Sequence, residues 1–428
     1  MTNPNWPSQR LGDLFDIGAG KTMSAAARAG NDKVPFLRTS NVLWDEVDLT
    51  TLDEMSIPPD ELGEKRLKAG DLLVCEGGDI GRAAVWDGRI PTMSFQNHLH
   101  RLRPAREDVE PRFYVYFLQC AFTQLGIFEG AGNKTTIPNL SRNRLASLEV
   151  PYPPLPEQRA LVRALATVRS AIATQGRATA AAEELKRATM RELFTRGLRD
   201  ASLIESEFGQ IPGTWLVVPL EKCATVQTGI AKGRLVSPAD AVEVPYLRVA
   251  NVQDGYLDLS QIKTIAIARS ELDRYRLLPG DVLLTEGGDF DKLGRGHMWR
   301  GQIDPCVHQN HVFAVRTDQT LLLPEYLAYL AQSHYGRGYF LKVAHKTTNL
   351  ACINTTKLKA LPVPLPPKLE EQREIVAILG AIDHKIDLHR HKRQVLEELF
   401  KALLHKLMTG EIRVQDLDLS ALDRPVAA

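Results

Sequence analysis

The stretch PYPPLPEQR (residues 151–159) returns later in the chain as PLPPKLEEQR (residues 364–373). After each copy, apolar residues follow at a 4-3-4 spacing: Leu161, Leu165, Val168 and Ile172 in the first, and Ile375, Leu379, Ile382 and Ile386 in the second. Such a spacing is the seam of a helix that packs on another helix. Pro156 and Pro367 favour helix starts, and Gly197 and Gly410 favour helix ends. The sequence therefore predicts two helices of about 40 residues, each roughly 60 Å long.

The whole chain is a direct repeat. EGGD (76–79) returns as 286–289, PFLRTSNV (35–42) as PYLRVANV (245–252), FQNH (95–98) as HQNH (308–311), and NKTT (133–136) as HKTT (345–348). The order is the same in both halves, and the offset stays between 209 and 214 residues. Chance does not produce this series, so the architecture is A-B-A′-B′, in which B is the long helix.

The A segments combine strands and helices. LLVC (72–75) and VLLT (282–285) are apolar runs after Gly-Asp turns, as expected of strands. FYVYFLQCAF (113–122) and EYLAYLAQ (325–332) have the pattern of amphipathic helices. The fold class is therefore α+β, with two similar mixed domains separated by two long α-helices.

A single helix of this length cannot bury its apolar stripe, and the simplest partner is its own copy. We therefore expect an intramolecular antiparallel coiled coil. Both seams turn polar at matching places, at Gln175 and Thr179 in one and at His389 and Arg393 in the other. These residues form either a polar layer that fixes the register or a solvated stretch.

The composition is that of an ordinary soluble globular protein, with 428 residues of which 44% are hydrophobic and 25% charged. This length exceeds one compact core. The five cysteines lie far apart without a CxxC pair, which argues against disulfides or a zinc knuckle and favours a reducing cytoplasm. No run is apolar for long enough to span a membrane. With a net charge of +1, DNA binding would depend on local contacts or on a second protein.

The patterns that suggest catalysis are incomplete. GAGKT (18–22) resembles a phosphate-binding loop, but Phe15 stands where that loop requires glycine, and the second copy reads TGIAKG (228–233). The alternatives are a plain turn or a basic loop that faces a phosphate backbone with Lys21, Thr22, Lys232 and Arg234. The histidines of HKIDLHRH (384–391) lack the spacing of a helical zinc site, and no Asn-Pro-Pro-aromatic motif occurs. We therefore expect neither catalysis nor a metal.

EGGD follows an expected strand in both copies, and its glycines let the backbone turn sharply and approach a partner closely. Glu76 and Glu286 could accept the amino proton of a cytosine in the major groove. Alternatively, the acids of EGGD cap their own loops by accepting backbone N–H bonds, and we favour this role for Asp79 and Asp289.

Two variable mixed domains, each followed by a long helix that a PLPEQ-like segment introduces, resemble the specificity subunit of type I restriction–modification enzymes. The resemblance covers essentially the whole chain. Its most specific parts are the proline-rich segments, GDLLVCEGGDIG with GDVLLTEGGDFD, the QNH tripeptides, and LMTGEIR (407–413). The first-copy version of the last motif, LFTRGLR (193–199), departs from it at Thr195, Arg196 and Gly197.

The resemblance implies target recognition domains at residues 1–152 and 204–363, spacer helices at 153–203 and 364–415, and a C-terminal tail at 416–428. Antiparallel helices would place the domains about a pseudo-two-fold axis, which matches the dyad of double-stranded DNA. Each domain would read one half of a bipartite site around an unread spacer. Two modification (methyltransferase) subunits would carry S-adenosylmethionine, and restriction subunits with ATP and Mg would join through them. The chain itself would bind no cofactor.

The candidate DNA-contacting residues are polar residues that recur on loops or lie where the copies differ. They are Lys21, Thr22, Arg38, Asn41, Glu76, Arg82, Asn97, Lys134, Thr135, Lys232, Arg234, Arg248, Asn251, Glu286, Lys292, Arg295, Asn310, Lys346 and Thr347. The arginines and asparagines of the PFLRTSNV and PYLRVANV motifs suit guanine and adenine edges, but they could instead brace the sheet. The QNH amides and the Lys-Thr pairs recur in both copies. Because domains that read different half-sites should differ at their readers, this recurrence favours a role in holding a loop or a phosphate.

Base readers are expected where the copies diverge, at residues 80–82 against 290–295 and at 22–33 against 234–240. EGGD would then be the shared scaffold of the divergent loop that follows it. Two other functions remain as alternatives. One is a coiled-coil scaffold that bridges two proteins without DNA. The other is a self-contained DNA methyltransferase, for which the sequence lacks a cofactor loop and a catalytic motif.

Overall fold

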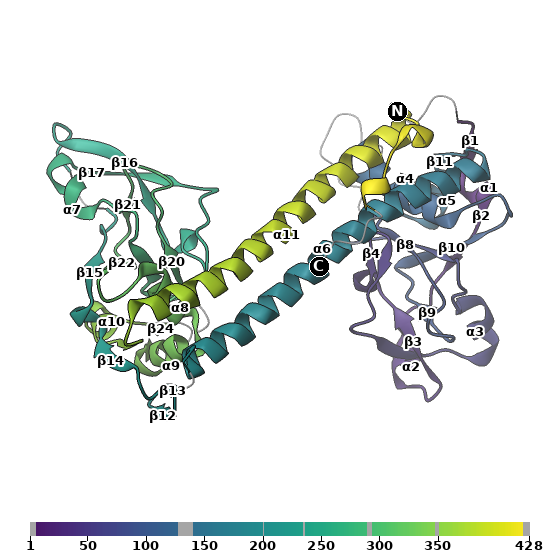
Figure 1. Ribbon diagram of the computed structural model, residues 1–428. Helices are drawn as coiled ribbons and strands as arrows, with labels where there is room; N and C mark the ends of the chain where they lie inside the picture. Colours follow the sequence, from purple (N-terminus) through teal and green to yellow (C-terminus); the bar gives the residue numbers. More distant parts are fainter. Residues whose placement is uncertain are drawn as a thin grey trace. The chain divides into compact units, whose positions relative to one another are not determined.

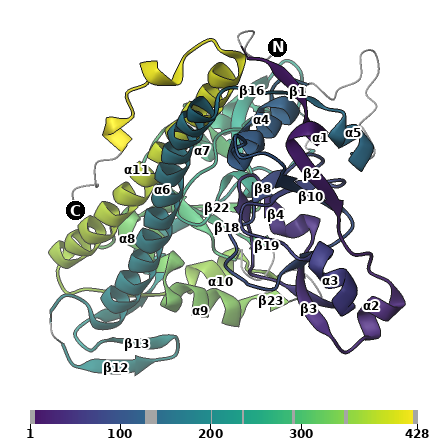
Figure 2. The ribbon, with the colours of Figure 1, turned by 90° about the vertical axis from the view of Figure 1, so that its right-hand side faces the viewer.

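The fold of this chain is shown in Figure 1 and Figure 2 as a computed structural model, which describes residues 6–126, 140–199, 201–233, 236–288, 293–346 and 351–422. The chain divides into two compact units, residues 1–176 with 390–428 and residues 177–389. Two long helices, α6 (Leu155–Arg196) and α11 (Leu369–Thr409), each contribute one half to each unit. The predicted helix ends are confirmed, because Gly197 and Gly410 follow the helices with positive φ angles of 66° and 77°. The division into recognition domains and spacers stays a prediction.

The first unit combines short helices with strands. Its strands are β1 (Ser8–Arg10), β2 (Phe15–Ala19), β3 (Lys33–Leu37), β4 (Val42–Leu43), β5 (Glu46–Val47), β6 (Asp53–Ser56), β7 (Leu72–Cys75), β8 (Ala83–Val85), β9 (Ser94–Phe95), β10 (Leu99–Pro104) and β11 (Glu149–Pro151). Its own α-helices are α1 (Leu11–Leu14), α2 (Ala25–Ala29), α3 (Pro59–Lys65), α4 (Pro111–Thr123) and α5 (Arg142–Ala146). The strands form the sheets β2-β10-β7-β8 and β6-β3-β9 and the pairs β1-β11 and β4-β5.

The second unit repeats this plan. Its strands are β12 (Leu203–Ser206), β13 (Gly209–Pro212), β14 (Leu216–Pro219), β15 (Ala224–Thr228), β16 (Ala241–Leu247), β17 (Lys263–Ala268), β18 (Val282–Thr285), β19 (Gly287–Gly288), β20 (Gly296–Met298), β21 (Val307–His308), β22 (Val312–Thr317), β23 (His345–Lys346), β24 (Ala351–Cys352) and β25 (Pro362–Leu365). Its own α-helices are α7 (Leu272–Tyr275), α8 (Pro324–Gln332), α9 (His334–Val343) and α10 (Thr355–Lys359).

The sheets of the second unit have the same order as those of the first. The sheet β15-β22-β18-β20 corresponds to β2-β10-β7-β8, the sheet β17-β16-β21 to β6-β3-β9, and the pair β14-β25 to β1-β11. The predicted strands LLVC and VLLT are β7 and β18, and the predicted amphipathic helices lie within α4 and α8. The direct repeat of the sequence is therefore a direct repeat of the fold.

In the first unit, the start of α6 and the end of α11 enclose one core with α4. Leu161, Leu165 and Val168 of α6 are buried together with Leu404 and Leu407 of α11, and Ile172 is partly buried. Each side chain of this kind stabilises the fold by about 1.5–3 kcal/mol when it leaves water. Because the beginning of one helix packs on the end of the other, the two helices run antiparallel here.

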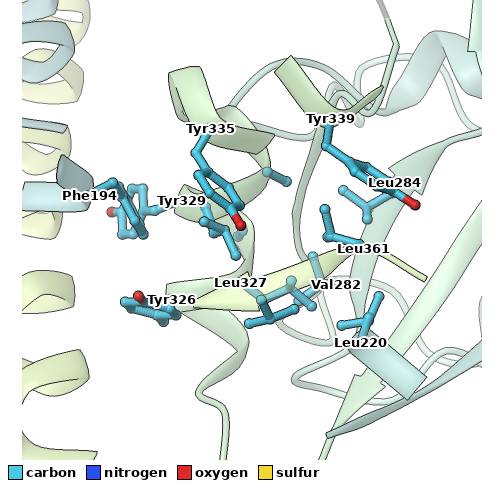
Figure 3. Close-up of a cluster of buried hydrophobic side chains, with 14 of the residues drawn as sticks. Phe194, Leu220, Val282, Leu284, Tyr326, Leu327, Tyr329, Tyr335, Tyr339 and Leu361 are labelled. Carbon is cyan, nitrogen blue, oxygen red and sulfur yellow. The ribbon is translucent and has the colours of Figure 1, made fainter. Parts of the chain in front are cut away.

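In the second unit, the end of α6 and the start of α11 join the core that Figure 3 shows. Phe194 of α6 packs on Tyr326 of α8, with ring centroids 5.3 Å apart. On α11, Ile375, Leu379 and Ile386 are buried and Ile382 is half-buried. The seam predicted from the 4-3-4 spacing therefore faces protein in both units.

Some of the polar residues in the helix seam are also buried. Gln175 in the first unit and His389 in the second are buried. Thr179 is half-buried, whereas Arg393 is exposed and pairs with Glu397 at 2.8 Å. Burial of Gln175 and His389 favours the polar layer over the solvated stretch at these two positions.

A carboxylate anchors each unit to its helices, and its side chain is 3% exposed for Asp45 and 28% exposed for Asp383. In the first unit, Asp45 accepts hydrogen bonds from Arg112 of α4 at 2.7 and 2.8 Å and from Tyr116 Oη at 2.7 Å, and Arg169 of α6 lies 3.7 Å away. In the second unit, Asp383 of α11 accepts from Lys186 of α6 at 2.7 Å and from Tyr329 of α8 at 2.8 Å.

Candidate nucleic-acid interface

Three recurring motifs that are distant in the sequence meet at one place in the second unit. Gly287 and Gly288 form β19, which pairs with β24, and β24 pairs in turn with β23, the first half of HKTT. From the QNH motif, His311 places its Nδ1 2.5 Å from Oε2 of Glu286. The backbone N–H of Glu286 also donates to the carbonyl of His311 at 3.0 Å. EGGD, QNH and HKTT therefore form one surface feature, which we call the motif junction.

The first unit has the same connections. The backbone N–H of Glu76 donates to the carbonyl of His98 at 3.0 Å, and Nδ1 of His98 lies 3.8 Å from Oε2 of Glu76. The carbonyl of Glu76 accepts from Leu140 N at 2.9 Å, as that of Glu286 accepts from Ile353 N at 2.8 Å. NKTT (133–136) lies outside the described residues.

The motif junction exposes an imidazole ring in each unit. The side chains of His98 and His311 are 59% and 55% exposed, whereas the glutamates that hold them are 18% and 27% exposed. In both units the glutamate faces Nδ1 of the histidine, so Nε2 is the nitrogen on the other side of the ring; in the second unit Nε2 lies 3.4 Å from Nδ2 of Asn310. The junction can thus hold an exposed polar group at the same place in both units.

The loop of GAGKT is shaped by close backbone contact. A Cβ at Gly20 would lie 2.3 Å from the carbonyl oxygen of Gln96, and one at Gly229 would lie 2.0 Å from that of His308. Because glycine has no Cβ, the backbone at each of these positions can pass close to the strand that precedes QNH. This common contact accounts for the similarity of GAGKT and TGIAKG without a phosphate site.

The candidate cations of this loop have different positions. Lys21 forms an isolated bridge with Gln96, and its Nζ lies 2.6 Å from Glu61. Ile230 occupies the corresponding bridge with Gln309 in the second unit. Thr22 and Lys232 are exposed. Arg234 lies outside the described residues.

The asparagines of the PFLRTSNV and PYLRVANV motifs are internal braces. Asn41 is buried; its side chain accepts from Arg38 N and donates to the carbonyls of Asp48 and Thr51, all at 2.9 Å. Asn251 makes the equivalent bonds to Arg248 N, the Asp258 carbonyl and the Gln261 carbonyl at 2.9, 2.9 and 3.2 Å. This geometry favours the bracing alternative for both asparagines, because their amides are already used.

The arginines beside these braces remain partly accessible. Arg38 Nη1 lies 2.9 Å from Asp53, and both side chains are about half exposed, at 42% and 50%. Arg248 Nη2 donates to the carbonyl of Gln261 at 3.1 Å. Both arginines can therefore reach a ligand while they hold their loops.

Arg82 and Arg295 occupy equivalent places. The carbonyl of Arg82 accepts from Cys75 N at 2.8 Å, and that of Arg295 accepts from Thr285 N at 2.9 Å. The carboxylate of Asp79 pairs with the guanidinium of Arg82 at 2.5 Å, and within the described residues it accepts no backbone N–H, so the predicted loop cap is wrong for Asp79. Arg295 Nη1 donates to Gln253 at 3.1 Å. Asp289 and Lys292 lie outside the described residues.

The remaining candidates lie at or beside the motif junction. Asn97 and Asn310 are half-buried, and Asn310 Nδ2 is 3.4 Å from Nε2 of His311. The backbone of Lys346 lies in β23. Lys134, Thr135 and Thr347 lie outside the described residues.

Sequence reasoning missed the two Glu-His pairs and the anchoring carboxylates. Glu76 with His98 and Glu286 with His311 each recur in both copies, and this double recurrence was the available signal. Asp45 gave no such signal because it does not recur in the second copy. Gly255 stands at the corresponding position, where its backbone N–H donates to β20.

The described residues contain no metal-binding cluster, and the thiol nearest to EGGD is unreactive. Within them, no group of three or more His, Cys, Asp or Glu side chains could hold a metal ion. Burial raises the pKa of the Cys75 thiol, directly before EGGD, to about 11, so this thiol is neutral at physiological pH and a poor nucleophile. No helix of the described residues is long and apolar enough to cross a membrane.

Comparison with known proteins gives a consistent picture. A family model described as "Type I restriction modification DNA specificity domain" matches residues 3–183 and 230–398. The EcoKI specificity subunit of Escherichia coli K12 is 24% identical over 402 residues, which cover 90% of this chain and 84% of that subunit. The MjaVIII specificity subunit of Methanocaldococcus jannaschii is 27% identical over 292 residues, which cover 66% and 67%.

A solved structure supports the fold. A chain from work on "complex assembly and conformational transition of the type I R-M system" aligns with a TM-score of 0.58 at 19% identity, covering 96% of this chain and 100% of that chain. The predicted fold class, with two mixed domains and two packed long helices, is confirmed.

Proposed function

Since this chain belongs to the family of type I restriction–modification DNA specificity subunits, we propose that it reads a split DNA site and brings its partner subunits to that site. The family is one of non-catalytic subunits, so this chain provides DNA specificity and not catalysis. The recognised site consists of two short half-sites around a spacer that the chain does not read. One half-site belongs to each unit.

The observation that carries this proposal is the double occurrence of the motif junction. Each unit joins EGGD to QNH through a Glu-His pair, and each presents an exposed histidine beside a polar loop. Two equivalent surfaces in one chain suit a ligand with two similar ends, and duplex DNA offers this through its dyad. The loops that follow EGGD differ between the units, which suits two different half-sites.

The long helices supply surface for the modification subunits. Leu185, Ile378 and Leu388 are exposed apolar residues on the helix halves of the second unit, and Val395 and Leu399 are on α11 in the first unit. An apolar helix face can dock into a hydrophobic groove of a partner. The net charge of +1 fits an assembly in which the partners neutralise most DNA phosphates.

The partner subunits carry the chemistry. Two modification subunits bind S-adenosylmethionine and methylate the site, and restriction subunits with ATP and Mg join the assembly. This chain binds none of these cofactors. Its contribution is the placement of the methyltransferase on the chosen sequence.

The test is to co-express this chain with the modification subunit encoded beside it and to map methylated bases across the host genome by long-read sequencing. We expect one split motif, with two fixed half-sites and a constant gap. Exchange of residues 22–82 for the corresponding segment of a relative should change one half-site and leave the other and the gap unchanged.

Two results would contradict the proposal. A complex that assembles but leaves no motif in the methylated bases would favour the protein-bridging scaffold instead. Methylation by this chain without any partner would favour a self-contained methyltransferase.

A further inference from the structure

The first unit contains an open cavity of about 360 Å³ beside the motif junction. Its polar lining comes from Arg28 of α2, Arg38 after β3, Asp53 and Glu54 of β6, and Gln96 of the QNH motif. Met23 and Phe36 line the rest. Two residues after Gln96, His98 meets Glu76, so the cavity and the motif junction share one turn.

The side chains of this cavity have unused hydrogen-bonding capacity. Asp53 receives one ion pair from Arg38 at 2.9 Å, which leaves further acceptor positions on its carboxylate. Nε of Arg38 is buried without a hydrogen-bond partner among the described residues. Arg28 is exposed and forms no side-chain ion pair within the described part of the chain. The cavity thus offers carboxylate acceptors and guanidinium donors side by side.

The second unit has the opposite charge at the same place. In β3 and β6, Phe36 pairs with Asp53, and in β16 and β17, Tyr246 pairs with Lys263. Arg248 and Gln309 correspond to Arg38 and Gln96. A shared arginine and glutamine therefore stand beside an aspartate in one unit and a lysine in the other.

Asp53 and Glu54 offset the charges of Arg28 and Arg38, so the first cavity lacks the net positive charge that would favour a DNA phosphate. In the major groove, the groups that donate to an acceptor are the amino groups of cytosine N4 and adenine N6. Guanine O6 and N7 are acceptors, and they suit lysine and arginine. The charge of the side chain at position 53 or 263 therefore determines whether a donor edge or an acceptor edge of a base fits.

We propose, on the basis of the function proposed above, that the cavity at Arg28, Arg38, Asp53 and Gln96 reads one base pair of the first half-site. The carboxylate of Asp53 accepts a hydrogen bond from the amino group of a cytosine or adenine, and the arginines donate to a neighbouring acceptor. In the second unit, Lys263 occupies the position of Asp53 and donates to an acceptor on a base edge. Residues 53 and 263 are therefore specificity-determining positions.

The test uses the complex with its modification subunits and maps methylated bases genome-wide for the wild-type chain, Asp53→Asn and Asp53→Lys. Asp53→Asn keeps the shape of the side chain. Because the lost pair with Arg38 is half exposed, the fold should persist. We expect discrimination at one base pair of the first half-site to fall roughly 10- to 100-fold. Asp53→Lys should shift that position toward guanine, and whether cytosine or adenine was preferred is read from the wild-type motif.

Matched variants supply the controls. Lys263→Asp should change only the second half-site, and Asp87→Asn, an exposed carboxylate paired with Arg89, should change neither. Arg28→Gln, on the exposed face of α2, should relax the same half-site as Asp53→Asn and tests the cavity if Asp53→Lys fails to fold.

The proposal is overturned if Asp53→Lys and Arg28→Gln methylate the wild-type motif with unchanged discrimination. It is equally overturned if an assembled variant complex loses methylation uniformly at all sites, since this indicates a phosphate contact. If the wild-type complex itself shows no split motif, the proposed function fails first, and that failure is seen before any variant is made.

Discussion

A buried histidine of the second unit, His308, occupies a position at which the first unit has a phenylalanine. His308 of β21 and Phe95 of β9 occupy equivalent positions, opposite Leu247 and Leu37, and both side chains are buried. His308 Nδ1 donates to the carbonyl of Val312 at 2.7 Å. Burial lowers the pKa of His308 from its ordinary value of 6.5. The neutral form is therefore the one that the folded domain accommodates.

This predicts an acid-sensitive second unit. Below about pH 6.5, the unfolded chain binds a proton at this histidine that the folded chain does not, so stability falls as the pH decreases through this window and is unaffected above it. Hydrogen exchange at pH 7 and pH 5 should show that peptides of the second unit lose protection on acidification. His308→Phe, which copies the first unit, should reduce this loss. Equal acid sensitivity in wild type and variant would assign the effect to another group, such as His297, whose pKa burial also lowers.

For single residues, the sequence could predict equivalent positions only where a motif recurs in both copies. EGGD, QNH and the bracing asparagines recur, and the structure places each at an equivalent position. Their roles were harder to predict, because the contact of Glu76 with His98 depends on strand order and not on local sequence. Asp45 and Asp53 differ from their counterparts in the other copy, so repetition gave no hint of either.

The two halves of the helix seam should contribute to stability in separate units. Leu165 and Leu379 are fully buried in the first and second unit, respectively. Leu165→Ala and Leu379→Ala should each lower the free energy of unfolding by about 2–5 kcal/mol, because each leaves a cavity. Denaturant titration read by hydrogen exchange would place each loss in its own unit. Leu185→Ala, at a position that is 53% exposed, is the matched control and should cost less than about 0.5 kcal/mol. A comparable loss in all three variants would contradict the assigned seam.

Helices and strands differ in how far local sequence specified them. The ends of α6 and α11 were predictable, because prolines and glycines act on the residues beside them. The strands β7 and β18 were predictable from their apolar runs. The pairing of β1 with β11, or of β14 with β25, was not, since about 140 residues separate such partners and no local pattern encodes them.

The whole molecule has too little net charge to hold DNA strongly by itself. With a net charge of +1, the isolated chain should neutralise few phosphates, so its affinity should vary little with salt. The complex with modification subunits should show a much steeper decline, with a slope of roughly −0.9 per neutralised phosphate in log affinity against log salt. Fluorescence anisotropy on a duplex with the mapped site, between about 50 and 200 mM salt, measures both slopes. An equally steep slope for the isolated chain would show that it supplies the phosphate contacts alone.

The segments that follow β7 and β18 are closed by equivalent backbone hydrogen bonds but contain different numbers of residues. Cys75 bonds to Arg82 around residues 76–81, and Thr285 bonds to Arg295 around residues 286–294. Three additional codons in the second half thus leave the flanking register intact. Two kinds of mutation in the gene should therefore differ in their effect on the fold. Point changes in the buried strands are expected to harm folding, whereas in-frame insertions and deletions in the loop sequence after EGGD are expected to cost less stability. A duplicated ancestral gene with two such tolerant sites can diverge at each one independently, so a population can diversify one half of its target while inheriting the other unchanged.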